Sequence, residues 1–262
     1  MTVPSKILPL AYITGASSGI GQALAARFAQ AGWRLALVAR REAEVRRWAA
    51  AAGLADDRWA FFAADVQVID SIVAAGQACI AQLGLPDVVI ANAGISVGMD
   101  SAERADLGVM RDTLATNITG AAATFQPFLR AMRERRSGTL VGVASVAAIR
   151  GLPGHGAYCA SKAGLVAYCE SLRGECRDAG VKVVTLLPGY IATPLTSGNP
   201  YPMPFLMQAD RFADVAFRTI QAGCSYRVIP WQMAIVAKLL RLLPNALFDR
   251  LLAGRGRKPR RS

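Results

Sequence analysis

Three side chains able to move a proton and polarise a carbonyl follow one another in a short stretch of the chain. Ser145 is followed by Tyr158 and Lys162, and on a helix the last two would lie on one face as i and i+4 neighbours. A phenol with a pKa of about 10 is a weak base at neutral pH, but a nearby ammonium stabilises its phenolate. The spacing therefore predicts Tyr158 as a general acid and base, Lys162 as the group that tunes it, and Ser145 as a hydrogen-bond donor to a substrate oxygen.

A glycine-rich turn near the N-terminus is suited to binding phosphate. Its sequence is Thr14-Gly15-Ala16-Ser17-Ser18-Gly19-Ile20-Gly21. Glycines allow a tight turn, and the helix that follows presents its first N–H groups to an anion. The spacing differs from the G-x-G-x-x-G of the general dinucleotide-binding fingerprint. On its own, the turn fits a structural link between a strand and a helix equally well.

The end of the second predicted strand indicates which dinucleotide would bind. A carboxylate at this place contacts ribose hydroxyls, whereas an arginine accommodates a 2′-phosphate. The chain has Arg40 and Arg41 here. We therefore predict NADP, with Arg40 as the main contact and Arg41 as its reserve. The alternative is a solvated arginine pair that opens the next helix.

Apolar runs of strand length alternate with longer helical patterns along most of the chain. Predicted strands cover residues 8–14, 35–39, 59–63, 88–91, 139–144 and 181–187. Predicted helices cover residues 19–31, 42–52, 66–82, 103–134 and 156–179. This alternation predicts an α/β fold with a doubly wound parallel sheet of the Rossmann type. A helix at 208–222 and a strand at 226–229 would complete a catalytic domain at 1–230, with an amphipathic helix and basic tail at 231–262.

Length and composition limit the class of protein. The chain has 262 residues, of which 53% are hydrophobic and 18% charged, which fits a single large core. Five scattered cysteines without a C-x-x-C pair argue against a disulfide framework or a metal site. The N-terminus lacks the apolar core and cleavage site of a signal peptide, so we expect a cytoplasmic protein.

Several motifs, in this order, resemble the short-chain dehydrogenase/reductase (SDR) family over about residues 8–195. They are the glycine turn, Asn92-Ala93-Gly94, Asn117, Ser145, Tyr158-x-x-x-Lys162 and Pro188-Gly189 with Thr193. The resemblance implies a nicotinamide-dependent oxidoreductase in which Lys162 also holds the nicotinamide ribose and Asn117 supports a water relay. The cofactor-binding residues that it implies are Gly15, Ser17, Ser18, Gly19, Ile20, Gly21, Arg40, Arg41, Asp65, Val66, Asn92, Ala93, Gly94, Tyr158, Lys162, Pro188, Gly189, Ile191 and Thr193. It further implies a homodimer or homotetramer that uses the helices at 103–134 and 156–179.

A proline-rich loop after the sixth predicted strand is expected to act as a lid rather than to form a strand. Its apolar side chains are Tyr190, Leu195, Tyr201, Met203, Phe205, Leu206 and Met207. Loops beyond the strand ends bind ligands in open α/β sheets, so we predict an apolar ketone or secondary alcohol, lipid-like or steroid-like, as substrate. Coverage of a core edge or subunit contact is an equal alternative. We expect His155 to shape the substrate mouth and Cys159 to serve helix packing.

Two other functions fit parts of the sequence. Gly94-Ile95-Ser96-Val97-Gly98 matches the nucleophile elbow of a serine hydrolase, with Ser96 as nucleophile and Asp100 or Asp106 and His155 as partners. This interpretation leaves the glycine turn and Arg40 unexplained. A non-enzymatic NADP-sensing or membrane-peripheral interaction protein would keep the fold without turnover, but the complete catalytic set does not favour it.

The C-terminal segment combines apolar and basic residues. From Trp231 onward, Lys238, Arg241 and Pro244 interrupt the apolar run, so it is too broken to span a bilayer. It fits an interfacial helix at the inner face of an anionic membrane, or a dimer contact with a solvated tail. Much of the net charge of +12 lies in the tail residues Arg250, Arg255, Arg257, Lys258, Arg260 and Arg261. No recognition module accompanies this charge, so no nucleic-acid partner is expected.

Overall fold

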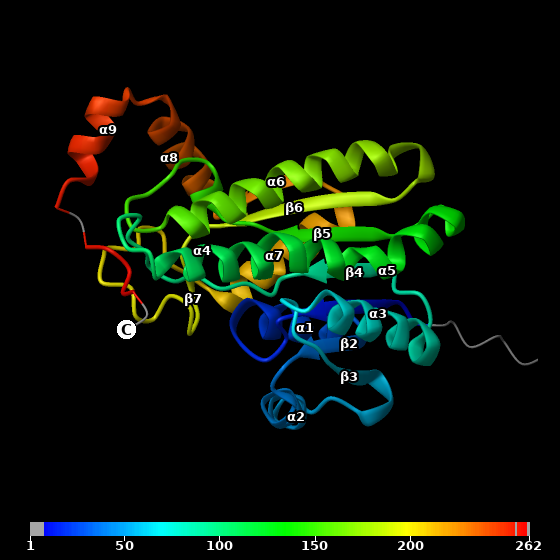
Figure 1. Cartoon of the computed structure of the whole chain (residues 1–262). Coiled ribbons are helices and arrows are strands. Elements are labelled where there is room, and N and C mark those ends of the chain that lie inside the picture. The colour runs from blue at the N-terminus through cyan, green and yellow to red at the C-terminus, as the bar shows by residue number, and fades with distance from the viewer. Residues whose placement is uncertain (1–7, 255, 261–262) are drawn as a thin grey trace, which may run out of the picture.

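A single parallel sheet forms the centre of the molecule (Figure 1). The computed structural model describes residues 8–254 and 256–260, and within them seven strands lie in the order β3-β2-β1-β4-β5-β6-β9. The strands are β1 (Leu10–Thr14), β2 (Arg34–Ala39), β3 (Trp59–Ala63), β4 (Val88–Ala91), β5 (Thr139–Val143), β6 (Lys182–Pro188) and β9 (Tyr226–Ile229). The order reverses between β1 and β4, which is where doubly wound sheets bind their ligands. The predicted Rossmann-type α/β fold is confirmed.

Helices cover both faces of the sheet (Figure 1). Phe28 and Phe212 belong to the buried cluster on one face, and Phe125 and Phe128 to the cluster on the other. Because neither face meets water, the strands are apolar along almost their whole length. The first face carries α1 (Gly19–Gln30), α2 (Glu42–Ala51) and α7 (Ala209–Ala222), and the second carries α3 (Ile69–Leu83), α4 (Asp106–Leu114), α5 (Gly120–Arg135) and α6 (Gly156–Cys176).

Several element boundaries differ from the sequence prediction. The helix predicted at 103–134 is divided, because a π-helical turn at Ala115–Thr119 separates α4 from α5. The helix predicted from residue 66 begins at Ile69, because Asp65 accepts a hydrogen bond from the Gln67 N–H at 3.0 Å and forms a turn that competes with the helix. The first strand, predicted from residue 8, begins at Leu10. Residues 1–7 lie outside the described residues.

The loop after β6 contains two short strands that were not predicted. The strands β7 (Ile191–Ala192) and β8 (Met207–Gln208) pair in parallel, so the expectation of no strand here was wrong. They are too short for a hydrophobic period to reveal them. The Met207 N–H also donates to the Tyr190 carbonyl at 2.9 Å, and the residues between the strands therefore form a loop closed at its base.

The C-terminal segment folds as two helices instead of one, α8 (Trp231–Leu242) and α9 (Asn245–Leu252). Pro244 lies between them and lacks the N–H that a continuous helix would need. Both project from the end of the sheet that carries the loops around β7 (Figure 1). Among the described helices, none is long and apolar enough to cross a membrane. The tail is not simply solvated, since Arg260 forms an ion pair with Asp106. Arg255 and Arg261 lie outside the described residues.

Candidate active site

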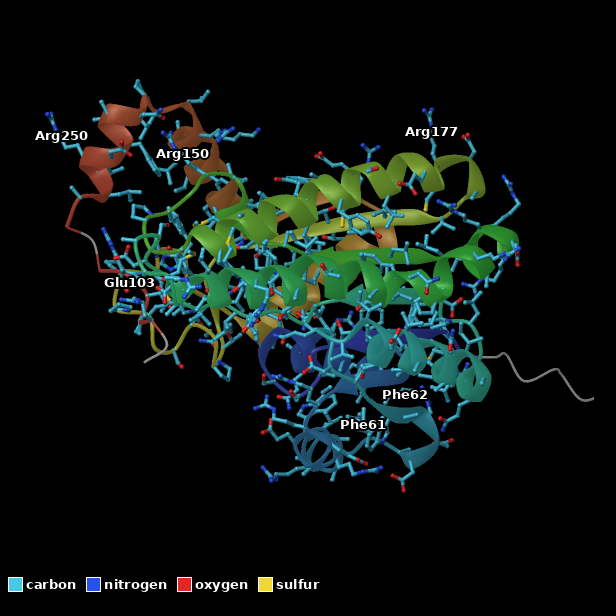
Figure 2. All side chains as sticks on the ribbon, viewed as in Figure 1. Phe61, Phe62, Glu103, Arg150, Arg177 and Arg250 are labelled. Atoms are coloured by element: carbon cyan, nitrogen blue, oxygen red, sulfur yellow. The ribbon has the colours of Figure 1, made fainter. Side chains whose placement is uncertain are left out.

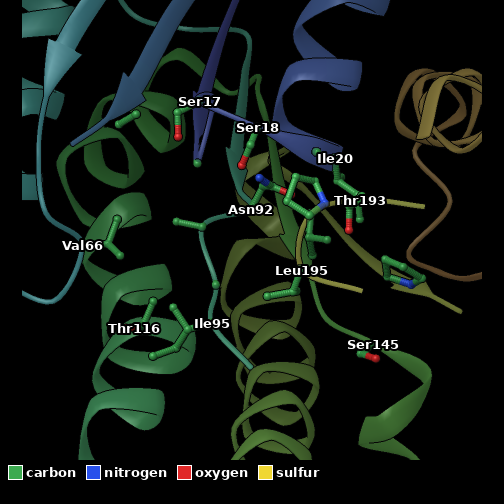
Figure 3. A pocket seen from close by; sticks show the side chains of 18 of the residues that line it. Ser17, Ser18, Ile20, Val66, Asn92, Ile95, Thr116, Ser145, Thr193 and Leu195 are labelled. Carbon is green, nitrogen blue, oxygen red and sulfur yellow. The ribbon is translucent and has the colours of Figure 1, made fainter. Parts of the chain in front are cut away.

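A cavity of about 430 Å³ lies at the carboxyl ends of the central strands (Figure 3). Every predicted cofactor residue except Gly21 lines it, and Ser145 lines it as well. Asn117 does not. Leu195, predicted as part of the lid, lines the cavity too, whereas the sequence analysis missed the lining residues Val38, Ala39, Ala64, Gln67, Ile95, Thr116, Val143, Ala144, Pro194 and Thr196. Most of these are apolar or small and carry no motif of their own, so only the arrangement of the strands reveals them.

The glycine turn is folded tightly enough to require its glycines. Gly15 and Gly19 have φ values of 69° and 56°, which favour glycine. A Cβ on Gly21 would lie 2.1 Å from the Gly15 carbonyl oxygen, which explains why Gly21 packs beneath the turn and does not line the cavity. Ser18 precedes α1 without a side-chain cap, so the first N–H groups of that helix are left for a ligand. The turn therefore fits a phosphate-bearing cofactor.

Two arginines stand at the end of the cavity formed by β2. The Arg41 guanidinium donates to the Ser17 hydroxyl at 3.0 Å and pairs with Glu44 at 3.1 Å. Arg40 pairs with Asp65 at 3.5 Å, and its side chain is 64% exposed. Both arginines therefore flank the glycine turn, and Arg41, predicted as the reserve, is the one that contacts it.

Lys162 is buried at the opposite end of the cavity. Its ammonium donates to the Val143 carbonyl at 2.8 Å and lies 5.9 Å from the centre of the Tyr158 ring. Burial lowers the pKa of Lys162 to about 8, because a charged ammonium loses hydration in this position. The α6 helix brings Tyr158 and Lys162 to one face, as the i and i+4 spacing predicts.

Tyr158 and Ser145 meet across the loop that follows β5. Burial raises the pKa of the Tyr158 phenol, and a hydrogen bond with Ser145 opposes that rise. Ser145 also caps a short 3-10 turn, Val146–Ala148, by accepting from the Ala147 N–H at 3.2 Å. Desolvation is thus the larger influence on Tyr158, which keeps the phenol protonated at neutral pH and suited to donating a proton.

Asn117 lies behind the cavity in the π-helical turn. Its side-chain oxygen accepts from the Ile95 N–H at 2.9 Å, while its amide donates to the Ile95 carbonyl at 3.0 Å and to Ser161 at 2.9 Å. These bonds fix the loop after β4 against α6. The side chain is thereby committed to positioning Ile95, so the part that Asn117 can offer to a proton relay is its backbone carbonyl.

His155 and two tyrosines form an aromatic cluster beside Tyr158. The His155 ring contacts the Pro153 carbonyl and the Tyr201 hydroxyl, both at 3.2 Å. Burial lowers the pKa of His155 and, together with the nearby phenols of Tyr190 and Tyr158, raises the pKa of Tyr201 to about 12. His155 therefore lies where the sequence analysis expected it, beside Tyr158.

The apolar residues of the loop after β6 divide into two groups. Met207 packs against the core cluster on the α1 face, so its role is structural. Phe205 and Leu206 are about half exposed. Cys159 is buried in helix packing, as expected. Leu195 lines the cavity and the Tyr201 hydroxyl contacts the His155 ring, so only part of this loop turns toward the site.

The residues of the hydrolase alternative have other partners. His155 contacts Tyr201 and Pro153, Asp106 pairs with Arg260, and the Gly98 N–H donates to the Pro259 carbonyl. These contacts give no support to a triad with Ser96. Among the described residues, no group of three or more histidine, cysteine, aspartate or glutamate side chains could hold a metal ion.

A family profile described as short chain dehydrogenase matches residues 9–201. The chain belongs to the short-chain dehydrogenase/reductase family. The chain is 40% identical over 242 residues to an uncharacterized oxidoreductase of Myxococcus xanthus, a match that covers 91% of this chain and 94% of that protein. The predicted family and the oxidoreductase class that acts on CH–OH and C=O groups are confirmed.

Solved structures agree with this membership. Actinorhodin polyketide ketoreductase with NADPH is 27% identical, with a TM-score of 0.77, and the match covers 85% of this chain and 95% of that chain. A 3-ketoacyl-(acyl-carrier-protein) reductase from Brucella melitensis, complexed with NADH, is 27% identical with a TM-score of 0.76. This match covers 86% of this chain and 98% of that chain. Both forms of nicotinamide cofactor thus occur in neighbours of the same fold.

Proposed function

We propose that the protein is an NADP(H)-dependent carbonyl reductase or alcohol dehydrogenase acting on an apolar ketone or secondary alcohol. The observation that carries the proposal is one cavity with Ser145, Tyr158 and Lys162 at one end and Arg40 and Arg41 at the other. When bound, the nicotinamide would supply or accept a hydride at the substrate carbon. The cavity and its uncapped helix N-terminus fit such a dinucleotide.

The chain's own residues handle the proton and the substrate oxygen. In the direction of reduction, Tyr158 donates its phenolic proton to the oxygen while Ser145 donates a hydrogen bond to it. The Lys162 ammonium stabilises the resulting phenolate and, with a pKa of about 8, returns a proton at little cost. The Asn117 carbonyl, in the π-helical turn, would hold the water that carries protons onward from Lys162.

The preference for NADP is supported by the two arginines at the end of β2. Arg41 lies against Ser17 and Arg40 is largely exposed to the cavity mouth. A guanidinium can bind a phosphate with two parallel hydrogen bonds, which an NAD ribose hydroxyl cannot use in the same way. Neighbours of the same fold hold NADPH or NADH, so the fold alone does not select one of the two cofactors.

An apolar substrate is supported by the aromatic cluster beside Tyr158. Tyr190 and Tyr201 have ring centroids 6.3 Å apart, and His155 and Tyr201 5.7 Å apart. Aromatic walls with a few hydrogen-bonding tips are typical of pockets for small carbonyl compounds. The proposed substrates are therefore ketones with an apolar body and the carbonyl at one end.

The test is oxidation of NADPH, and then of NADH, by the purified protein with steroid, long-chain 3-keto and small aromatic ketones. Turnover that prefers NADPH and falls about 1,000-fold in Tyr158→Phe is expected, because the variant keeps the ring but lacks the proton donor. Unchanged activity in Tyr158→Phe would refute the mechanism. Cofactor binding without turnover of any ketone would instead favour the sensing protein.

We further propose that the α8 and α9 helices bind an anionic membrane from its cytoplasmic side. Trp231 and Leu242 are 64% and 80% exposed, and Lys238, Arg241 and Arg250 lie on the same two helices. This combination is typical of interfacial helices. Flotation with vesicles containing an anionic lipid, but not with zwitterionic vesicles, is expected; a stable homodimer that buries these residues and does not float would contradict it.

A homodimer or homotetramer is proposed as well, through α4, α5 and α6, independently of α8 and α9. Removing residues 231–262 would then leave the oligomer intact. Light scattering of the truncated protein tests this: a monomer would show that the C-terminal helices hold the subunits together instead.

A further inference from the structure

Residues 256–260, which we call the strap, cross the loops that surround Tyr158. These loops follow β4, β5 and β6, and each of them contacts the strap. Figure 1 shows the red end of the chain running back from α9 to the loops at the carboxyl ends of the strands. The strap therefore lies at the edge of the sheet where an α/β protein receives its ligand.

The loops after β4 and β6 bind the strap through its backbone and one lysine. Gly98 forms an isolated parallel bridge with Arg260, and its N–H donates to the Pro259 carbonyl at 3.1 Å. The Lys258 ammonium donates to the Leu195 carbonyl at 3.1 Å, and Leu195 lines the cavity. The strap thus joins one loop to the other.

The loop after β5 contacts the strap immediately before α6. The Arg257 side chain lies so close to Gly154 that a Cβ there would be 3.1 Å away. Met99, next to Gly98, donates its N–H to the Gly154 carbonyl at 3.0 Å, and its sulfur accepts from the Ala157 N–H at 3.1 Å. The strap is therefore packed, through one layer of residues, on the first turn of the helix that carries Tyr158.

An ion pair fixes the end of the strap. Arg260 donates to both oxygens of Asp106, at 2.7 and 3.3 Å, and lies 3.9 Å from Glu103, which is labelled beside the tail in Figure 2. The Asp106 side chain is only 5% exposed. A hydrogen bond from the Asp100 N–H, and then the bonds from Arg260, hold the pKa of Asp106 below its usual range. Asp106 is therefore charged at neutral pH and the pair persists.

The backbone of the strap excludes a side chain at Gly98. A Cβ at this position would lie 2.0 Å from the Lys258 carbonyl oxygen and 2.7 Å from the Pro259 oxygen. These atoms are backbone, so they could not yield without movement of the strap. The φ angle of Gly98 is outside the left-handed region, so its backbone conformation does not by itself require glycine.

We propose that the strap determines substrate size: it closes the pocket beside Tyr158 over small ketones and must be displaced before a bulkier ketone enters. Lys258 bonds to the cavity-lining Leu195 and lies near enough to His155 for its charge, in addition to burial, to lower the pKa of that ring. The Asp106–Arg260 pair and the close contact at Gly98 keep the strap in place. The inference rests on the proposed function, although displacement of the strap can be measured without turnover.

The test compares three altered proteins with the wild type. In Gly98→Ala, the new Cβ should push the strap away by contact with the backbone of Lys258 and Pro259. A protein that ends at Gly254 lacks the strap and keeps α8 and α9. Gly151→Ala is the matched control, because a Cβ there meets nothing within 4 Å and its φ angle is not left-handed.

The first measurement is kcat/KM with NADPH for a small aromatic ketone and for a steroid ketone. The ratio of the bulky to the small substrate should rise at least about 10-fold in Gly98→Ala and in the truncated protein, as expected when a wall of the pocket is removed. Combining the two changes should add nothing further, since both act on one contact. The Gly151→Ala protein should match the wild type.

The second measurement is brief trypsin treatment followed by the mass of the intact chain. Cleavage after Arg257 should be slow in the wild type and in Gly151→Ala, and at least about 10-fold faster in Gly98→Ala, because cleavage requires an open segment. In the wild type, NADPH with the steroid ketone should accelerate this cleavage, whereas NADPH with the small ketone should not.

Two results would overturn the proposal. One is an unchanged ratio of the two substrates in both the truncated protein and Gly98→Ala. The other is equal cleavage after Arg257 in the presence of either ketone. Absence of turnover with every ketone, together with the expected cleavage pattern, would overturn the proposed function while supporting the strap.

Discussion

The cofactor cavity and the C-terminal helices meet at the same edge of the sheet, but different forces hold them. The cavity is built on buried strand ends and one long helix, with Lys162 4% exposed and Asn117 1% exposed. The α8 and α9 helices expose many apolar side chains and are held by a few contacts, above all those of Arg150, labelled next to α8 in Figure 2. Chemistry therefore depends on rigid packing, whereas the C-terminal helices depend on single side chains that can be removed without disturbing the core.

The largest expected effect is on chemistry. In Ser145→Ala, kcat should fall about 100-fold or more, because the substrate oxygen loses a hydrogen bond that strengthens in the transition state. The Kd of NADPH should stay unchanged. Steady-state kinetics and cofactor titration test this. Ser145→Thr, which keeps a hydroxyl, is the control and should retain more activity than alanine; equal loss in both would assign Ser145 to loop structure only.

The buried ammonium should appear in the pH dependence of stability. Lys162 has a pKa of about 8 in the folded protein against an ordinary value of 10.5. Between these values the unfolded chain binds more protons, so stability should rise with pH by up to about 1.4 kcal/mol per pH unit relative to Lys162→Met. Below pH 8 Lys162 is protonated in both the folded and the unfolded chain, so the difference in stability between the wild type and Lys162→Met should be constant.

Denaturant unfolding of the wild type and Lys162→Met from pH 7 to 10.5 measures this difference. Taking the difference removes the opposite contribution of buried phenols and thiols such as Tyr12 and Cys79, whose pKa values are raised by burial. A wild-type-minus-variant stability that stays flat above pH 8 would show that Lys162 is hydrated in solution.

Arg150 should control the C-terminal helices without affecting the cavity. Its guanidinium donates to the carbonyls of Leu240 and Leu243 and lies 3.7 Å from the centre of the Phe248 ring. In Arg150→Ala, the free energy of opening α8 and α9 should fall by about 2 kcal/mol, because carbonyls at a helix end lose their donor.

Hydrogen exchange followed by mass spectrometry measures this opening. Protection of β4 and β5 should be unchanged in the same variant. Arg241→Ala, which removes an exposed arginine from α8, is the control and should have no effect. Equal loss of protection in the central strands would show that the two regions unfold together.

The smallest expected effect is on cofactor choice. Arg41→Ala should raise the KM for NADPH about 10-fold and leave the KM for NADH unchanged, since the 2′-phosphate loses a charge-assisted hydrogen bond. Arg40→Ala should do the same to a smaller extent, because Arg41 contacts Ser17 in the glycine turn whereas Arg40 pairs with Asp65 outside it. Arg47→Ala, an exposed arginine of α2, is the control. A parallel rise for NADH would mean that Arg41 only shapes the glycine turn.

Features that depend on local spacing could be predicted from the sequence, whereas contacts between distant residues could not. Tyr158 and Lys162 lie one helical turn apart, and Gly15 and Gly19 lie in one turn, so local spacing revealed them. The sheet followed from regular alternation of apolar runs. The π-helical turn around Asn117 escaped prediction. Such a turn adds one residue to a helix, and the apolar pattern on either side still resembles that of one continuous helix.

Contacts between distant residues also escaped prediction. Arg260 and Asp106 are 154 positions apart, and Arg150 reaches carbonyls 90 positions away. Periodicity carries no information about such pairs. The charge of the tail does not indicate its backbone contact with Gly98, because this contact forms only in the folded chain.

The glycine at position 98 offers a way to recognise related proteins with the same closure. Where the strap is present, the backbone at Lys258 excludes a side chain at this position; a homologue without the strap lacks this obstacle. Glycine at 98, an acid at 106 and an arginine close to the C-terminus should therefore be kept or lost together among homologues, and this joint pattern would separate enzymes with a covered active site from those with an open one.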